Sequence, residues 1–234
     1  MEAVVLAGGF GTRLRSIISD KPKCMAQVAR RPFLEWLVMQ AREQDVTRFV
    51  FCTGFLGDLI KSYFGKGTHW GVEIAYSHEA APLGTGGALR LALDHVQSSS
   101  FIVLNGDSYC RYDIARLASL MNAQSAAAVI WLVRMGDCGR FGSVDLGTDG
   151  SIQAFKEKGA SANPGLANAG VYLLQREFVE TIPVGRAISL EREVFPARIG
   201  DRFFGIPGEG PFIDIGTPES YAEATAFMRM EWSS

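Results

Sequence analysis

The 234-residue sequence predicts an α/β protein whose mainly parallel sheet is flanked by helices, with a small antiparallel elaboration in the second half. Two observations predict this fold. In the first half, short apolar runs typical of buried strands alternate with segments whose apolar residues recur every three or four positions. In the second half, two short segments typical of strands flank Gly147–Gly150, whose composition is that of a hairpin turn.

The first half is expected to consist of strand–helix–strand units. Apolar runs predict strands at 3–7, 49–52, 72–76 and 101–104. Apolar residues at helical spacing predict helices at 32–44, around 56–63 and around 89–96. Units of this kind pair their strands in parallel, because the helix carries the chain back across the sheet.

The second half is less regular. Strands are expected at 127–133, 143–146, 151–155 and 170–174. Thr217 is a plausible N-cap with Pro218 at the first helical position, which predicts a final helix. Its inward-facing residues are expected to be Tyr221, Ala224, Thr225 and Met228. We expect a single domain over residues 1–234.

Composition excludes several classes of protein. Apolar residues make up 47% and charged residues 21%, which is ordinary for a globular enzyme and unlike a disordered or collagen-like chain. Lysine and arginine number 23 against 25 aspartates and glutamates, so the basic excess typical of nucleic-acid-binding proteins is missing. Small phosphorylated substrates remain compatible with this charge, because a few well-placed cations suffice to bind them.

Partners and location follow from further absences in the sequence. No apolar run approaches the roughly 20 residues of a membrane-spanning helix, and the first residues lack the basic segment of a signal peptide. No C-x-x-C pair occurs among Cys24, Cys52, Cys110 and Cys138, which argues against a zinc or redox site. We therefore expect a cytoplasmic protein with free thiols, small-molecule substrates and no nucleic-acid or membrane partner.

A glycine-rich segment follows the first expected strand. Leu6–Leu14 reads LAGGFGTRL, and its glycines let backbone N–H groups approach a bulky anion without a Cβ in the way. The segment lacks the Gly-Lys-Ser/Thr ending of a P-loop, and Leu14 stands where a dinucleotide fingerprint has its third glycine. It contains instead Arg13, a permanent cation whose planar fork suits phosphate.

A second set of residues follows at a short interval. Pro22–Met25 reads PKCM, and Pro32 then opens an expected helix that contains Leu34 and Glu35. Together with Leu6–Leu14, these residues resemble the signature of the sugar-1-phosphate nucleotidyltransferases, and the resemblance extends over nearly the whole chain. It implies a Rossmann-like fold of the nucleotide-diphospho-sugar transferase type, with Mg²⁺ as cofactor. It also implies a nucleotide-binding half at 1–125 and a sugar-binding half at 126–234.

The resemblance also implies the residues of the site. The catalytic candidates are Arg13, Lys23 and Asp107, and the metal ligands are Asp107 and Asp214. A second glycine segment, Pro82–Leu89, is expected to be a loop that binds the nucleotide. The nucleotide-binding candidates are Leu6, Ala7, Gly8, Gly9, Gly11, Thr12, Arg13, Lys23, Glu79, Gly84, Thr85 and Gly86. The sugar-phosphate-binding candidates are Asn105, Gly142, Glu157, Lys158, Asn168, Gly170 and Tyr172.

The implied reaction is nucleotidyl transfer, in which a sugar 1-phosphate attacks the α-phosphorus of a nucleoside triphosphate and pyrophosphate leaves. Both substrates are anions, so we expect the protein to act by positioning and by electrostatic stabilisation. Glu79 stands where thymidylyl and uridylyl relatives usually carry glutamine. A carboxylate can accept two N–H groups of guanine but cannot donate to a pyrimidine carbonyl, which favours GTP; the alternative is a merely solvated glutamate.

The identity of the sugar is inferred from two further segments. Arg13–Ile18 is more similar to the guanylyltransferases that act on D-glycero-α-D-manno-heptose 1-phosphate, and Ser189–Pro196 fits the guanylyltransferases of manno-sugars. The leading hypothesis is therefore transfer from GTP to this heptose 1-phosphate, giving GDP-heptose. The alternatives are a mannose-1-phosphate guanylyltransferase, a uridylyltransferase for an amino-sugar 1-phosphate, and a catalytically inactive nucleotide-sugar-binding subunit.

A homodimer is a further hypothesis. Four apolar aromatic residues are candidates to cover its interface: Trp36, Trp70, Phe203 and Phe204.

Overall fold

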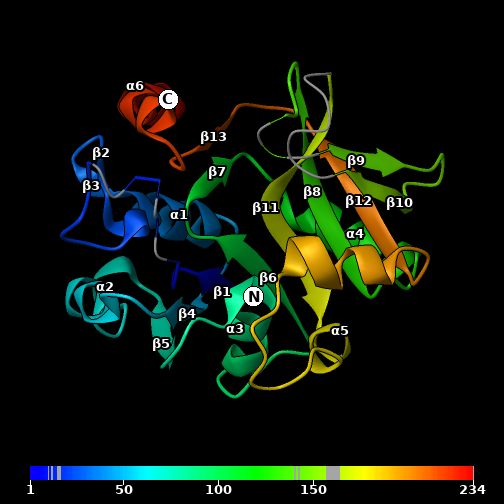
Figure 1. The fold of residues 1–234 in the computed structure, drawn as a ribbon, viewed down its shortest axis with the longest axis horizontal. Helices are drawn as coiled ribbons and strands as arrows, with labels where there is room; N and C mark the ends of the chain where they lie inside the picture. Colours follow the sequence, from blue (N-terminus) through cyan, green and yellow to red (C-terminus); the bar gives the residue numbers. More distant parts are fainter. Residues whose placement is uncertain are drawn as a thin grey trace.

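A computed structural model describes residues 1–9, 11, 13–14, 17–139, 141, 143–156 and 164–233. At the centre of this described part is a seven-stranded sheet in the order β12-β8-β11-β6-β1-β4-β5 (Figure 1). Its strands are β1 (Glu2–Leu6), β4 (Arg48–Thr53), β5 (Glu73–His78), β6 (Ser100–Asn105), β8 (Ala128–Met135), β11 (Gly165–Gln175) and β12 (Phe203–Gly208). β11 is antiparallel to its neighbours β6 and β8, whereas the other pairs in the sheet are parallel. The predicted mainly parallel sheet is confirmed.

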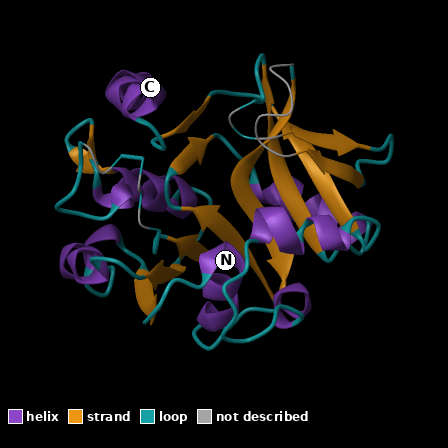
Figure 2. Ribbon diagram, viewed as in Figure 1, coloured by secondary structure: helices purple, strands orange, loops and turns teal. Residues whose placement is uncertain are grey.

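Both faces of this sheet are buried, because successive residues of each strand point to opposite sides. Ala3 and Val5 belong to one hydrophobic core, whereas Val4 between them belongs to the other. Residues of α1 (Phe33–Arg42), α2 (Gly57–Phe64), α4 (Ile114–Ala123) and α6 (Pro218–Glu231) complete the first core. Residues of α3 (Gly84–Ala92) and α5 (Arg176–Glu180) complete the second. Figure 2 shows the helices arranged around the strands of the sheet. Burial on both faces explains why the strands are apolar runs in the sequence.

Three short antiparallel pairs lie outside the main sheet in the part of the chain that is described. They are β9 (Ser143–Leu146) with β10 (Ile152–Lys156), β7 (Ser108–Cys110) with β13 (Phe212–Asp214), and β2 (Gln27–Val28) with β3 (Arg31–Pro32). The first pair confirms the predicted hairpin around Gly147–Gly150. Single helical turns at Lys23–Met25, Thr68–Trp70 and Pro196–Arg198 and a π-helix at Leu190–Val194 complete the described elements.

The final helix confirms its predicted cap and inner face. The Thr217 side chain accepts the Ser220 N–H in a capping box, with Pro218 in the first turn. Ala224 and Met228 are fully buried. The hydroxyl of Tyr221 donates to the carbonyl of Gln27 at 2.9 Å, and Thr225 accepts the N–H of Ala29 at 3.2 Å, so α6 packs against β2 and its turn.

The second glycine segment is not a loop, which corrects the expectation from the sequence. α3 begins at Gly84, where φ is +67° and a Cβ would lie 2.6 Å from the carbonyl oxygen of Ile188. A Cβ at Gly87 would lie 2.3 Å from the carbonyl oxygen of Arg186. These glycines therefore allow the backbone at 186–188 to pack against the first turn of α3, a contact with a remote segment that local sequence does not signal.

The proposed interface residues are mostly in the core, which corrects another expectation. Trp36, Phe203 and Phe204 are only 7%, 2% and 8% exposed. Trp36 packs against Trp232 of the C-terminal segment with ring centroids 5.3 Å apart, and Phe203 belongs to the second core. These three side chains are therefore not available to cover an interface, because the sheet and its helices already bury them.

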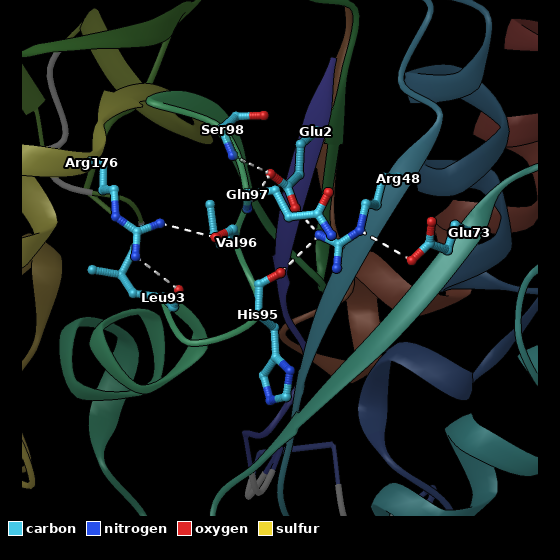
Figure 3. Close-up of polar contacts among 9 residues, drawn as sticks. All are labelled: Glu2, Arg48, Glu73, Leu93, His95, Val96, Gln97, Ser98 and Arg176. Atoms are coloured by element: carbon cyan, nitrogen blue, oxygen red, sulfur yellow. Dashed lines mark hydrogen bonds and ion pairs between the residues drawn. The ribbon is translucent and has the colours of Figure 1, made fainter.

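A polar network closes the amino ends of the parallel strands (Figure 3). The carboxylate of Glu2, only 3% exposed, accepts the N–H groups of Gln97 and Ser98, each at 2.9 Å, and pairs with Arg48. Arg48 also pairs with Glu73 on β5 at 3.2 Å. The network ties β1, β4 and β5 to the turn after α3 at the end of the sheet opposite the strands' carboxyl ends.

The carboxyl ends of β1 and β6 form a crevice. The chain leaves β1 for β4 on one side, whereas β6 lies on the other side of β1. Open α/β sheets bind ligands at such a switch point, because the loops that leave the two strands diverge. The N–H of Gly106 donates to the carbonyl of Leu6 at 3.0 Å, which places the two loops side by side. Within the described ranges, every helix is too short or too polar to cross a lipid bilayer.

Candidate active site

The crevice opens into a cavity of about 430 Å³, here called the first cavity. The glycine segment after β1, the turn before α3, the start of α3 and the loop after β6 line it. The predicted nucleotide-binding residues among its lining are Leu6, Ala7, Gly8, Gly9, Gly11, Arg13, Lys23, Glu79, Gly84 and Thr85. Gly86 is not among them, because it packs against Ile188 and its N–H donates to the Ile188 carbonyl at 2.9 Å. Thr12 lies outside the described residues.

A second cavity, of about 540 Å³, adjoins the first. The β9–β10 hairpin, β11, the π-helix and β13 contribute to its walls. The predicted site residues that line it are Arg13, Lys23, Asn105, Asp107, Asn168 and Asp214. Gly170 and Tyr172 do not line this cavity but hydrogen-bond to Asn168, which does. Gly142, Glu157 and Lys158 lie outside the described residues.

Four of the predicted residues line both cavities: Arg13, Lys23, Asn105 and Asp107. They come from the glycine segment, the turn after it, and the carboxyl end of β6. Two cations, an amide and a carboxylate therefore lie where the cavities meet. Ligands bound in the two cavities would come together at these four side chains.

Lys23 is held at this junction by a short ion pair. Its Nζ lies 2.6 Å from Oδ2 of Asp107, and its side chain is only 13% exposed. The single helical turn at Lys23–Met25 fixes the backbone, with Pro22 before it and Cys24 and Met25 buried in the core. The ammonium group is thus prepositioned, and the low exposure reduces the screening of its charge by water.

Asp107 and Asp214 are brought together by the pairing of β7 with β13. Asp214 lies opposite Ser108 in this ladder, and the N–H of Ile215 donates to the backbone carbonyl of Asp107 at 2.9 Å. Asp214 also accepts the N–H of Gly216 at 2.9 Å. Two residues far apart in the sequence therefore present carboxylates to the same cavity.

This pair of carboxylates suits Mg²⁺. No group of three or more His, Cys, Asp or Glu residues within the described ranges could hold a metal by itself. Mg²⁺ does not need one, because it typically binds one or two carboxylates and takes its other oxygen ligands from substrate phosphates and water. Asp107 and Asp214 supply such hard oxygen donors beside two cavities that are open to phosphates.

Glu79 lines the first cavity and lies against Gly8 of the glycine segment. Its Oε2 accepts the N–H of Leu83 at 2.9 Å, and a Cβ on Gly8 would lie 2.3 Å from its Oε1. Gly8 thus leaves space for this carboxylate. Burial raises the pKa of Glu79, while the Leu83 hydrogen bond and the nearby His78 oppose the rise.

Asn168 is directed into the second cavity by a bulge in β11. The register with β8 shifts between Asn168 and Val171. Gly170 in the bulge has a φ of +74°, and its N–H donates to Oδ1 of Asn168 at 2.9 Å. A Cβ on Gly170 would lie 2.8 Å from that of Asn105, so glycine is required both for the backbone conformation and for this approach.

Several residues of the second cavity were missed by sequence reasoning. Ser189, Glu191 and Arg192 line it from the π-helix and its cap, and Lys156 lines it from β10. Lys156 pairs with Asp145 across the hairpin at 2.7 Å. The segment Ser189–Pro196 drew attention only through its resemblance to other sequences, because no residue spacing links it to the glycine segment.

The family model described as nucleotidyl transferase matches residues 2–231. The chain belongs to this nucleotidyl transferase family. It is 33% identical over 225 residues to D-glycero-alpha-D-manno-heptose 1-phosphate guanylyltransferase of Aneurinibacillus thermoaerophilus, covering 96% of each chain. It is 34% identical over 229 residues to mannose-1-phosphate guanylyltransferase of Mycobacterium tuberculosis, covering 97% of this chain but 64% of that relative's length.

A solved structure matches the fold of this nucleotidyl transferase closely. HddC from Yersinia pseudotuberculosis, complexed with GMP-PN, superposes with a TM-score of 0.85 at 32% identity. The match covers 97% of this chain and 99% of that chain. The resemblance inferred from the sequence motifs is thus confirmed at the level of the family.

Proposed function

We propose that this nucleotidyl transferase transfers a guanylyl group from GTP to D-glycero-α-D-manno-heptose 1-phosphate, giving GDP-heptose and pyrophosphate. The observation that carries the proposal is the pair of adjoining cavities that share Arg13, Lys23, Asn105 and Asp107. Two polyanions repel each other, and cations fixed at the junction of their binding sites lower that repulsion. We also propose that residues 1–234 act as one domain, with the nucleotide half at 1–125 and the sugar half at 126–234.

The chemistry needs positioning more than proton transfer. An oxygen of the sugar phosphate attacks the α-phosphorus of GTP and forms a new P–O bond. The bond from the α-phosphorus to the oxygen bridging to the β-phosphorus breaks, and pyrophosphate leaves with the electron pair. The second pKa of a phosphate monoester is about 6, so the attacking oxygen is already ionised near neutral pH and requires no general base.

The cations take separate roles in this reaction. Arg13, from the glycine segment, contacts the leaving phosphates and stabilises the charge that grows on the bridging oxygen. Lys23, held by Asp107, contacts the reacting phosphates at the junction of the cavities. The backbone N–H groups of Gly8, Gly9 and Gly11 bind phosphate oxygens of the triphosphate. By family resemblance, Lys158 holds the attacking phosphate.

Asp107 and Asp214 would hold Mg²⁺, as their oxygen donors and common cavity allow. When bound, this ion supplies positive charge next to the phosphate oxygens. The presence of both carboxylates, together with Arg13 and Lys23, counts against an inactive binding subunit, which would be expected to have lost some of these residues.

Glu79 supports guanine as the base. Its half-buried carboxylate lines the first cavity and is kept in place by the N–H of Leu83. In the ionised form it has acceptor capacity left for the two adjacent N–H groups of guanine. The names of the relatives agree with this assignment, since both are guanylyltransferases.

A pyrophosphate-release assay tests the proposal. ATP, GTP, CTP and UTP are each combined with the heptose, mannose, glucose and N-acetylglucosamine 1-phosphates. We expect GTP with the heptose 1-phosphate to give the highest kcat/KM. Preference for mannose 1-phosphate, the second candidate because of the mycobacterial relative, or for UTP would overturn it.

A further inference from the structure

We propose that Glu191 is a positioning residue that couples the two cavities through the hydroxyl of Thr85. Binding of the triphosphate in the first cavity then orders the residues that receive the sugar in the second. This inference rests on the proposed function and deepens it, because it assigns to this chain a link between its two substrate sites.

Glu191 lies on the π-helix at the wall of the second cavity. The Ser189 hydroxyl caps this helix by accepting the N–H of Arg192 at 3.2 Å, and donates to Oε2 of Glu191 at 3.0 Å. π-helical turns often mark functional sites, because the wider turn directs side chains away from the regular helical positions.

The link to the first cavity runs through a single hydroxyl. Thr85, which lines that cavity at the start of α3, donates its Oγ1 hydrogen to Oε2 of Glu191 at 2.8 Å. Oγ1 of Thr85 also accepts the N–H of Leu190 at 2.8 Å. A movement of the first turn of α3 therefore acts on both the backbone and the carboxylate of the π-helix.

The link to the sugar side runs through Tyr172. Its hydroxyl donates to Oε1 of Glu191 at 3.3 Å and accepts the side-chain N–H of Asn168 at 2.9 Å. Asn168 in turn lines the second cavity. Burial, and next the Glu191 charge, raises the pKa of Tyr172 well above its ordinary value, so the phenol stays protonated and remains a donor.

The two links meet on one side chain. Glu191 accepts from Thr85 with one oxygen and from Tyr172 with the other, so its carboxylate cannot rotate without breaking a bond on one side. The side-chain N–H of Asn168 is thereby linked to Thr85 through Tyr172 and Glu191, while its Oδ1 is held by the N–H of Gly170. Polyhydroxylated sugars need donors and acceptors in fixed directions, and this chain of hydrogen bonds supplies them only when the start of α3 is in place.

Calorimetry tests the coupling directly. The Kd of the heptose 1-phosphate, and separately of mannose 1-phosphate, is measured with and without a GTP analogue that has a methylene group between its α- and β-phosphorus atoms. In the unmodified protein we expect the analogue to tighten binding of the heptose 1-phosphate roughly tenfold, the effect of one hydrogen bond to a charged group. Thr85→Val and Glu191→Ala should each reduce this factor to below about twofold.

Matched variants separate this role from a structural one. Thr85→Ser keeps the hydroxyl and should keep the coupling. Glu180→Ala removes an exposed carboxylate of α5 that lines neither cavity, and should also keep it. In steady-state assays, Thr85→Val should raise the KM of the sugar 1-phosphate more than it lowers kcat.

The outcomes distinguish this inference from the proposed function. Coupling absent in the unmodified protein, or unchanged in both Thr85→Val and Glu191→Ala, overturns the inference even if the enzyme makes GDP-heptose. Coupling that is present and lost in these variants supports it, whichever sugar gives the fastest turnover. Failure of the unmodified protein to turn over GTP with any sugar 1-phosphate overturns the proposed function instead.

Discussion

Substitution of Lys23 by methionine removes one charge from the junction of the two cavities. The Nζ of Lys23 lies 2.6 Å from Asp107, and the side chain is 13% exposed. The stem of Lys23 packs near Gly11, where an added Cβ would lie 3.0 Å from the Cβ of Lys23. Methionine keeps this apolar stem, so the change is confined to the charge.

The size of the effect follows from this environment. Two unit charges about 4 Å apart interact by about 4 kcal/mol at the effective dielectric constant of about 20 that suits sites near a protein surface. Loss of a single preorganised donor in other enzymes costs about 2.7–4 kcal/mol, or about 10²–10³ in kcat. Because Lys23 is largely shielded from water, we expect a loss of kcat of this order.

The assay is release of pyrophosphate at saturating GTP and sugar 1-phosphate. Lys21→Met is the matched control, because Lys21 has the same chemistry two positions earlier but pairs with the exposed Asp20 at 3.4 Å. It should retain kcat to within about twofold. If Lys23→Met turns over within about threefold of the unmodified enzyme, the assignment of Lys23 to the reacting phosphates is wrong.

Three further predictions concern the base, the stability of the sheet and a thiol. GTP affinity should fall as the pH falls through the raised pKa of Glu79, because a protonated carboxyl cannot accept both guanine N–H groups. In calorimetry, Glu79→Gln should bind GTP more weakly at pH 8 than the unmodified protein does, and its affinity should no longer depend on pH in this range. Glu2→Ala should destabilise the fold by about 3 kcal/mol, because two backbone N–H groups lose their acceptor and Arg48 loses one of its two carboxylate partners. It should lower Tm by about 6–12 °C in circular dichroism. Burial raises the pKa of Cys24 to about 12, so iodoacetamide should modify it slowly at pH 8 in the folded protein and rapidly after unfolding, as mass spectrometry would detect.

Each of these predictions has a contradicting result. If GTP binding weakens equally with falling pH in Glu79→Gln and in the unmodified protein, the pH dependence comes from the phosphates of GTP and not from Glu79. Glu180→Ala, which removes an exposed carboxylate, is the control and should leave Tm nearly unchanged. An equally unchanged Tm in Glu2→Ala would show that the network at the amino ends of the strands contributes little to stability. Rapid alkylation of Cys24 in the folded protein would contradict its burial in the wall of the first cavity.

Much of the fold could be predicted because the signals are local. The strands β1, β4, β5 and β6 are apolar runs, and the helices between them have apolar residues at helical spacing. The beginning of α3 was misjudged, because its glycines are explained by a contact with 186–188. The position of Phe203 was misjudged for a similar reason, since β12 joins the sheet beside β8 rather than beside a strand near it in sequence.

The candidate site was predictable in its residues but not in its arrangement. Motifs singled out Arg13, Lys23, Asp107 and Asp214. That these side chains line a common cavity depends on the switch point between β1 and β6 and on the pairing of β7 with β13. Glu191 was missed, because its importance arises only from contacts with elements remote in the sequence.

The sequence by itself determined most strands and helices of the first half, the hairpin around Gly147–Gly150, the final helix, and which short segments carry phosphate-binding chemistry. These properties depend on side-chain type and on spacing over a few residues. The tertiary structure alone decided that Asp214 lies beside Asp107 and that Thr85 reaches Glu191. Such contacts join segments about 100 residues apart, and their geometry is fixed by the packing of the whole sheet, to which no local pattern is sensitive.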